Sequence, residues 1–414
     1  MISGSNINLV KSHNVRVILL RLLRDGQDSR VELARKLSLS NTTITNITTE
    51  LLHQGIIAEE SLEAESEDIQ RPVGRPRVML RLVATARYAV GVHIGVGNLR
   101  VAITDLFANI LHNKFGEFDL TAPAEAVLEQ IAQMVEGIIE SSGIDRHLLL
   151  GVGVGASGLV NYDAGINVLA PRLGWENIPI RQILEDRLGL QITVDNNVRA
   201  MALAEAFYGA GRGVGTVVFI YGRIGVGSGI VVDGRVFRGS SAGAGEIGHN
   251  TIITNGGEIC SCGNTGCLET LLSEPVWVKH AQKLAHENPH SLIAQQLKVE
   301  NGKLKIEHVF QAAREGDRCM SEFITEQSCY LGIALANLVN ILNPELVILG
   351  GMLAQGSDLI LPVAEEKMRQ ASFARLGDKV KLQTTIFGWR AGVIGAASLA
   401  LTRFFFLNED NLLS

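Results

Sequence analysis

The chain has 414 residues, of which 46% are hydrophobic and 19% charged, and its formal net charge at pH 7 is −6. This length predicts two or three domains, and the composition excludes a chain that is disordered throughout. The negative balance excludes a protein that is basic over its whole surface, so any affinity for nucleic acid has to come from a local segment.

The first two predicted elements are helices, and the first of them is amphipathic. Apolar residues recur at helical spacing between Leu9 and Leu23, and Gly26 predicts where that helix ends. The four residues that run from Ser29 to Glu32 have the capping-box pattern, in which the serine and glutamate side chains satisfy free backbone donors. This pattern predicts a second helix that reaches about Leu37.

A third helix is predicted after the turn at residues 38–40, because Ile44, Ile47 and Leu51 form an apolar stripe. Two short helices joined by a tight turn, the second opening on small polar residues, are typical of a DNA-binding helix-turn-helix. A plain bundle of well-capped helices fits these residues about as well. The candidate DNA contacts of the third helix are Ser40, Asn41, Thr42, Thr43 and Asn46.

The next segment favours DNA binding. Two strands are predicted at residues 55–60 and 78–82, and the stretch between them contains Arg71, Arg75 and Arg77 among prolines. Prolines keep the chain extended, and arginines suit a narrow A·T-rich minor groove. Such a stretch alone is typical of a solvated linker, but its position after a helix-turn-helix favours a wing. We therefore predict a winged helix-turn-helix domain over residues 1–82, with these three arginines on DNA.

From Tyr88 onward, strand-like apolar runs alternate with helical stretches and end in the run at residues 345–350, which predicts an α/β body. Glycines gather at residues 91–97, 151–155 and 220–229, where a backbone could approach a phosphate or a sugar. These glycines are weak signals, because tight turns explain most of them.

A cluster of metal-binding residue types gives the strongest signal. Five cysteines are too few for a disulfide framework, and three of them lie within residues 260–267. The set His249, Cys260, Cys262 and Cys267 would fill a tetrahedral zinc shell and leave no open position, which predicts a structural Zn²⁺. The alternative is three reduced cysteines and an unrelated histidine. Cys319 and Cys329 lie in a helical pattern, and we expect them in the core.

These residues resemble the signature of the ROK family, which contains bacterial sugar kinases and sugar-responsive repressors. The resemblance covers nearly the whole chain and includes residues 170–179, 194–205 and 392–397. It implies a two-lobed, actin-like ATPase fold of the ribonuclease H-like type. The implied first lobe spans residues 83–193 and the second spans residues 194–414, with the last helix packing back on the first lobe. A winged helix ahead of this body is the arrangement of the repressor branch.

The resemblance also assigns the sugar site. It places hydroxyl contacts at Asn196, Asn197, Glu246, His249 and Glu269. The family's kinases have an aspartate as general base where this chain has Asn197, and an amide cannot accept the proton of the sugar hydroxyl. Asp195 is a poor substitute, because adjacent strand residues face opposite ways.

The phosphate-binding positions depart from the kinase pattern as well. His93 and Asn98 stand where the kinases have an aspartate and a threonine around two glycines, and Arg223 replaces a small residue in the second phosphate loop, where its side chain could fill the phosphate space. We therefore predict a protein that binds sugar without phosphoryl transfer. A sugar kinase that phosphorylates a hexose or amino sugar with ATP is the alternative.

The predicted protein is thus a repressor of genes for carbohydrate metabolism or transport. We expect a homodimer or dimer of dimers that binds operator DNA and changes its DNA affinity with the bound sugar. A sugar-transport protein that sequesters the repressor is an alternative to the small effector. The first residues lack the pattern of a signal peptide and no apolar run could span a bilayer, so we expect a cytoplasmic protein without a membrane partner.

Overall fold

The computed structural model describes residues 7–61 and 78–408, and its internal contacts divide the chain into two units. The first unit consists of residues 1–195 and 396–414, and the second consists of residues 196–395. The body of each unit has its own hydrophobic core. The predicted boundary at residue 82 falls inside the first unit and stays a prediction. Within the described ranges, no helix has the length and hydropathy needed to cross a bilayer.

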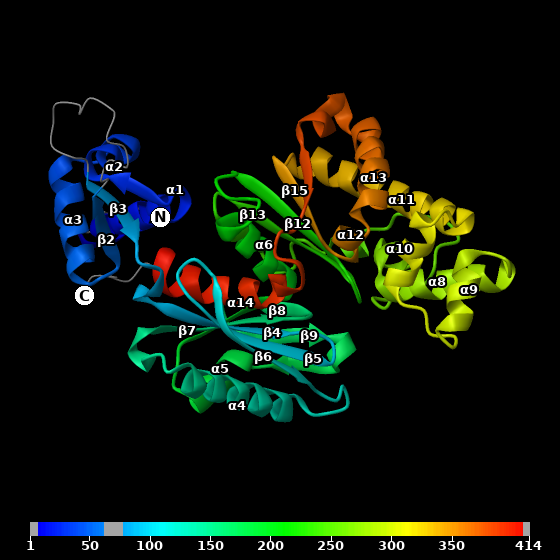
Figure 1. Ribbon diagram of the computed structural model, residues 1–414, viewed down its shortest axis with the longest axis horizontal. Helices are drawn as coiled ribbons and strands as arrows, with labels where there is room; N and C mark the ends of the chain where they lie inside the picture. The colour runs from blue at the N-terminus through cyan, green and yellow to red at the C-terminus, as the bar shows by residue number, and fades with distance from the viewer. Residues whose placement is uncertain (1–6, 62–77, 409–414) are drawn as a thin grey trace, which may run out of the picture. The chain divides into compact units, whose positions relative to one another are not determined.

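In the first unit, the described residues 7–61 and 78–82 form three helices and a three-stranded antiparallel sheet (Figure 1). Strand β3 lies between β1 and β2. The three predicted helices and both predicted strands are confirmed, whereas β1 is too short to have been predicted. The elements are α1 (Ile7–Asp25), β1 (Gln27–Ser29), α2 (Arg30–Leu37), α3 (Asn41–His53), β2 (Ile57–Ser61) and β3 (Val78–Leu82).

Serine caps begin both helices of the helix-turn-helix. The Ser29 hydroxyl accepts a hydrogen bond from the Glu32 backbone N–H at 3.2 Å, and the Ser40 hydroxyl accepts one from Thr43 N–H at 3.1 Å. The Glu32 carboxylate, for its part, accepts hydrogen bonds from the Arg35 guanidinium. Each cap satisfies an N–H that the helix itself leaves without a partner, so the sequence fixes where the two helices begin.

The rest of the first unit is built on a five-stranded sheet in the order β11-β7-β4-β5-β6. A small three-stranded sheet is formed by the residues between β7 and β11. The large sheet contains β4 (Tyr88–Ile94), β5 (Asn98–Thr104), β6 (Ile110–Glu117), β7 (Leu149–Ala156) and β11 (Ile192–Asn196). The small sheet contains β8 (Leu159–Asn161), β9 (Ile166–Ala170) and β10 (Trp175–Ile178). The helical segments are η1 (Ala84–Ala86), α4 (Ala124–Ser142), η2 (Arg146–Leu148), η3 (Pro171–Leu173) and α5 (Ile180–Leu188).

The glycines at residues 151–155 lie inside strand β7 rather than in a turn, and Gly153 there has a packing role. A Cβ atom on Gly153 would come within 1.8 Å of the carbonyl oxygen of Ala396, in helix α14 (Ala391–Leu401). The missing side chain therefore lets the second half of α14 lie directly on β7. That part of α14 and the π-helix η7 (Thr402–Phe406) belong to the first unit.

The second unit has a five-stranded sheet in the order β14-β13-β12-β15-β16. Its strands are β12 (Thr216–Gly222), β13 (Val226–Val232), β14 (Arg235–Phe237), β15 (Leu346–Gly351) and β16 (Lys381–Thr384). Its α-helices are α6 (Asn197–Tyr208), α7 (Glu269–Leu272), α8 (Glu274–Glu287), α9 (Leu292–Val299), α10 (Ile306–Arg314), α11 (Arg318–Leu342), α12 (Met352–Gln355) and α13 (Ser357–Ala371). Short helical turns complete it at η4 (Ile247–His249), η5 (Phe373–Lys379) and η6 (Gly388–Arg390).

The two large sheets share one topology. In each, three consecutive antiparallel strands form a meander, and its first strand pairs in parallel with a strand that comes later in the chain. The last strand of each sheet along the chain, β11 in the first unit and β16 in the second, then joins at the edge. The predicted α/β class is confirmed, and the repeated strand order is that of the duplicated lobes of the actin-like fold.

Candidate functional site

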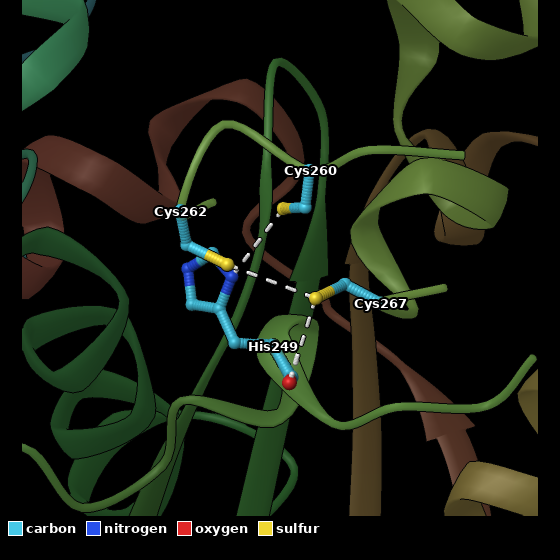
Figure 2. A group of neighbouring side chains, drawn as sticks. All are labelled: His249, Cys260, Cys262 and Cys267. Carbon is cyan, nitrogen blue, oxygen red and sulfur yellow. Dashed lines mark hydrogen bonds between the residues drawn. The ribbon is translucent and has the colours of Figure 1, made fainter. Parts of the chain in front are cut away.

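The predicted metal ligands lie together in the second unit (Figure 2). The ligand atoms of His249, Cys260, Cys262 and Cys267 all lie within 4.8 Å of one another. The Cys260 sulfur is 3.7 Å from His249 Nδ1, and the sulfurs of Cys262 and Cys267 are also 3.7 Å apart. Thiolates bound to one zinc ion in tetrahedral geometry lie roughly 3.8 Å apart, so the donor set and its spacing fit a metal such as zinc.

Backbone hydrogen bonds shape the loop that carries the three cysteines. The Cys260 N–H donates to the Asn264 carbonyl at 2.8 Å, and Gly266 N–H donates to the Glu258 carbonyl at 2.9 Å.

Burial, with the neighbouring thiols as a second cause, raises the pKa of Cys267 to about 12. A cation bound here would therefore displace a proton from this thiol.

Glu269 connects this loop to the neighbouring strand. Its side chain is 8% exposed, and one carboxylate oxygen accepts a hydrogen bond from the backbone N–H of Val226 at 3.1 Å. The other oxygen accepts from the hydroxyl of Ser261, between the first two cysteines, at 3.3 Å. A supporting role for the cysteine loop is therefore visible in its contacts.

Asn196 and Asn197 stand where strand β11 ends and helix α6 begins. The Asn196 side-chain oxygen caps α6, because it accepts hydrogen bonds from the N–H groups of Val198 at 2.8 Å and Arg199 at 3.1 Å. Asn197 is the first residue of the helix and is half-buried, whereas Asp195 is fully buried in the strand. With its oxygen engaged in the cap, Asn196 can meet a ligand only through its amide N–H groups.

Glu246 lies close to the metal-binding set. Its backbone carbonyl accepts a hydrogen bond from His249 N–H at 3.1 Å. The residue as a whole is exposed, but partial burial of its carboxyl group raises the pKa of that group, while the charges of His249 and Arg199 lower it. Glu269 adds to the rise in the pKa of Glu246 by like-charge repulsion. These four charged or polar residues therefore share one electrostatic environment, and sequence reasoning missed Arg199 among them.

The predicted phosphate-loop residues lie in separate units. His93 is 9% exposed inside strand β4 of the first unit, and Asn98 begins strand β5 there after a turn. Arg223 of the second unit is exposed in the turn after β12, and its charge opposes the rise in the pKa of Glu274 that burial causes. The exposed position of the Arg223 side chain leaves the idea that it fills the phosphate space as a prediction.

Helix α3 presents a polar face that carries no charged side chain at its N-terminal end. Asn41, Thr42 and Asn46 are exposed, as predicted, whereas the Thr43 hydroxyl lies 2.8 Å from that of Ser40 within the cap. Thr45, Thr49 and His53 are exposed as well and extend the face along the helix. Thr45 follows Thr42 by three residues and His53 follows Thr49 by four, a spacing that places them on one helix face in the sequence itself. The three arginines predicted to bind DNA lie outside the described residues.

Basic residues in the described part of the winged helix are mostly ion-paired. Arg30, for example, reaches the Glu59 carboxylate at 2.7 Å and donates to the Thr48 hydroxyl at 3.1 Å, which joins α2, α3 and β2. The other ion pairs are Lys11–Glu50, Arg21–Asp25, Arg24–Asp25, Arg35–Glu32, Lys36–Asp28 and Arg81–Glu60. These ion pairs connect elements of the N-terminal part, and each of these cations has a carboxylate partner within the chain.

Comparison with known proteins agrees with the family resemblance of the sequence. Residues 89–403 match the ROK family model. The chain is 29% identical to the xylose repressor of Caldicellulosiruptor bescii, over 96% of this chain and 97% of the repressor. It is 32% identical to a glucokinase of Halalkalibacterium halodurans, over 76% of this chain and 94% of the enzyme. A crystal structure of a ROK family transcriptional regulator, a homologue of the Escherichia coli MLC protein, superposes with a TM-score of 0.81 at 29% identity and covers 98% of both chains.

Proposed function

Because the chain belongs to the ROK family, we propose that it is a DNA-binding transcriptional repressor of carbohydrate genes whose affinity for operator DNA depends on a bound sugar. The observation that carries the proposal is the set of three helices and three strands formed by residues 7–61 and 78–82, ahead of the family domain. The likeness to a xylose repressor and to a ROK regulator extends over nearly the whole chain, whereas the glucokinase covers only 76% of it.

Operator DNA is proposed to bind along helix α3. The amides of Asn41 and Asn46 suit adenine edges in the major groove, and the methyl group of Thr42 suits thymine. Arg71, Arg75 and Arg77 between β2 and β3 are proposed to enter a narrow A·T-rich minor groove, where their charges also release counterions from the DNA. Ser40 and Thr43 form the N-terminal cap of α3 and would position that helix on the DNA. Thr43 would contact the DNA backbone from this end of the helix.

The sugar is proposed to bind in the second unit, at Asn196, Asn197, Glu246, His249 and Glu269. Carboxylates and amides can bridge neighbouring hydroxyls with paired hydrogen bonds. The electrostatic coupling of Glu246 to His249 and Glu269 supports one common site. Because His249 Nδ1 faces the cysteines, Nε2 would be the ring nitrogen available to the sugar.

We also propose that the metal is a structural Zn²⁺, held by His249, Cys260, Cys262 and Cys267. The ligand spacing and the complete four-residue set support this assignment. Zinc would fix the loop that leads to Glu269, and would thereby stabilise the sugar site without taking part in any reaction.

The alternative function is a sugar kinase, which the 32% identity to a glucokinase favours. Asn197 at the position of the general base argues against it, because loss of a base costs on the order of 10²–10⁴ in rate. Purified protein should consume no ATP above background with hexoses, pentoses or amino sugars. We expect Asn197→Asp to recover little turnover and to leave sugar binding intact. Robust turnover by the unmodified protein would establish the kinase instead.

The proposed assembly is a homodimer or dimer of dimers, because a palindromic operator needs two winged helices related by a twofold axis. Sedimentation of the free protein and of its DNA complex tests this.

A sugar-transport protein could replace the small effector, and pull-down from cells grown with and without sugar separates the two. A thermal-shift screen tests the sugar itself, because a ligand at about 100 times its Kd stabilises by ~2.7 kcal/mol.

A further inference from the structure

A glycine-rich loop at residues 239–245 leads directly to Glu246. Three of its seven residues are glycines, and Ala242 in its centre has a φ of 55°, in the left-handed region that residues with a side chain rarely adopt. Such a loop gains much conformational entropy when it is released, so it needs anchors to hold Glu246 in one place.

Two anchors from neighbouring elements hold this loop. At its end, the Gly245 carbonyl accepts hydrogen bonds from both the N–H and the hydroxyl of Ser228 in β13, at 3.0 and 2.7 Å. At its centre, the Ala242 carbonyl accepts a hydrogen bond from the Arg199 guanidinium. Arg199 lies in the first turn of α6, two residues after Asn197, and is only 2% exposed.

A close contact between helix α6 and strand β13 fixes the position of Arg199. A Cβ atom on Gly229 of β13 would come within 2.8 Å of the Arg199 Cα and 2.6 Å of the Ala202 Cβ, so only glycine lets α6 lie this close to the strand. One buried side chain therefore connects the asparagine end of the site to its glutamate end.

We propose that Arg199 is a positioning residue for sugar binding, which holds the 239–245 loop through the Ala242 carbonyl and thereby keeps Glu246 in place. This inference rests on the proposed sugar site. A charged donor buried against a carbonyl contributes more than a neutral hydrogen bond. Loss of the anchor should therefore weaken sugar binding without loss of the zinc loop, because none of the four metal ligands contacts Arg199 in the described hydrogen bonds.

The test compares Arg199→Met and Arg199→Lys with the unmodified full-length protein. Arg235→Met is the matched control, because Arg235 is an exposed arginine of the neighbouring strand β14. Calorimetry measures the affinity for D-xylose, D-glucose and N-acetyl-D-glucosamine, and hydrogen exchange measures the opening of residues 239–246. Zinc content and operator binding report on the rest of the fold.

We expect Arg199→Met to weaken binding of the recognised sugar by about 10- to 100-fold and to speed exchange of the loop by a similar factor. Arg199→Lys should be intermediate, and Arg235→Met unchanged. The proposal would be overturned if a folded Arg199→Met protein exchanged the hydrogens of the loop, or bound the sugar, as the unmodified protein does. If that variant does not fold, either result in Arg199→Lys overturns it. If none of the three sugars binds the unmodified protein, the sugar site fails for them, whereas the exchange comparison still tests the anchor.

Discussion

Replacing Glu269 with alanine should destabilise the second unit, because this buried carboxylate accepts hydrogen bonds from both the Val226 N–H and the Ser261 hydroxyl. A buried N–H left without a partner costs about 1–3 kcal/mol, and an ordinary hydrogen bond contributes about 0.5–1.5 kcal/mol. The sum is roughly 2–4 kcal/mol. For a unit of this size, that loss lowers the midpoint of thermal unfolding by about 5–15 °C.

The assay is thermal unfolding of zinc-loaded protein, run beside competition with a chelator for the metal. Glu258→Ala is the matched control, because Glu258 is an exposed glutamate just before the first cysteine. We expect the control to stay within about 0.5 kcal/mol of the unmodified protein. Glu269→Gln should lose less than the alanine variant, since its amide oxygen can still accept from Val226.

The reasoning would be refuted if Glu269→Ala unfolded at the temperature of the control and retained zinc equally well. If the prediction holds, a lost sugar response in Glu269→Ala has two causes, the missing hydroxyl contact and the weakened cysteine loop. Glu246 is exposed and accepts no described side-chain hydrogen bond of this kind, so Glu246→Ala is the cleaner test of the sugar site.

Three further predictions concern the metal, the DNA and the pH dependence. Cys262→Ala should lose bound zinc, measured by metal analysis, because three ligands leave an incomplete shell; full occupancy would disprove the site. Replacing Arg75 and Arg77 together should flatten the salt dependence of operator binding, because fewer counterions are released, whereas Asn46→Ala should act selectively between sequences; an unchanged slope argues against the wing contact. Burial raises the pKa of Glu205 above its ordinary 4.5, so the native state holds this proton more tightly than the unfolded chain does. Thermal stability should therefore fall as pH rises from 4.5 through the raised pKa, and this loss should be absent in Glu205→Gln; equal pH slopes in both proteins would exclude that cause.

Local patterns predicted the three N-terminal helices and the strands β2 and β3 well. Ser29 was predicted as a helix cap, because a serine before a helix satisfies donors within three residues along the chain. Ser40 was predicted only as a DNA contact, and the structure shows that it caps α3 as well. Strand β1 was not predictable, since its three residues acquire their structure only by pairing with β3, some fifty residues later. The helix-turn-helix depends on near neighbours in sequence, and its sheet depends on distant ones.

The metal set was predictable from residue types, because few arrangements other than a metal site bring a histidine and three cysteines so close in sequence. The contacts around it were not. Glu269 was expected beside the site, but its bond to Val226 joins residues 43 positions apart. Arg199 showed no signal at all, because a single arginine in a helix gives no indication that its side chain is buried against a distant loop.

Glycine patterns were the least informative part of the sequence. The glycines around Gly153 resemble a phosphate-binding loop, yet they lie in the interior of a strand on which α14 packs. A close approach between two backbones and a tight turn both require the absence of a side chain. Only the partner, here Ala396, distinguishes these two roles, and it lies more than 240 positions away in the sequence.

The central claim is that one chain binds DNA and senses sugar, and a single titration tests it most directly. The DNA would be a genomic fragment that is first selected for its binding to this protein. Fluorescence anisotropy would follow binding of the zinc-loaded protein to that fragment as D-xylose, D-glucose or N-acetyl-D-glucosamine is added. The account predicts sequence-specific binding whose affinity changes with one of these sugars, and a Glu246→Ala variant that binds the fragment equally well but no longer responds. Absence of any specific fragment, or an unaltered sugar response in Glu246→Ala, would contradict it.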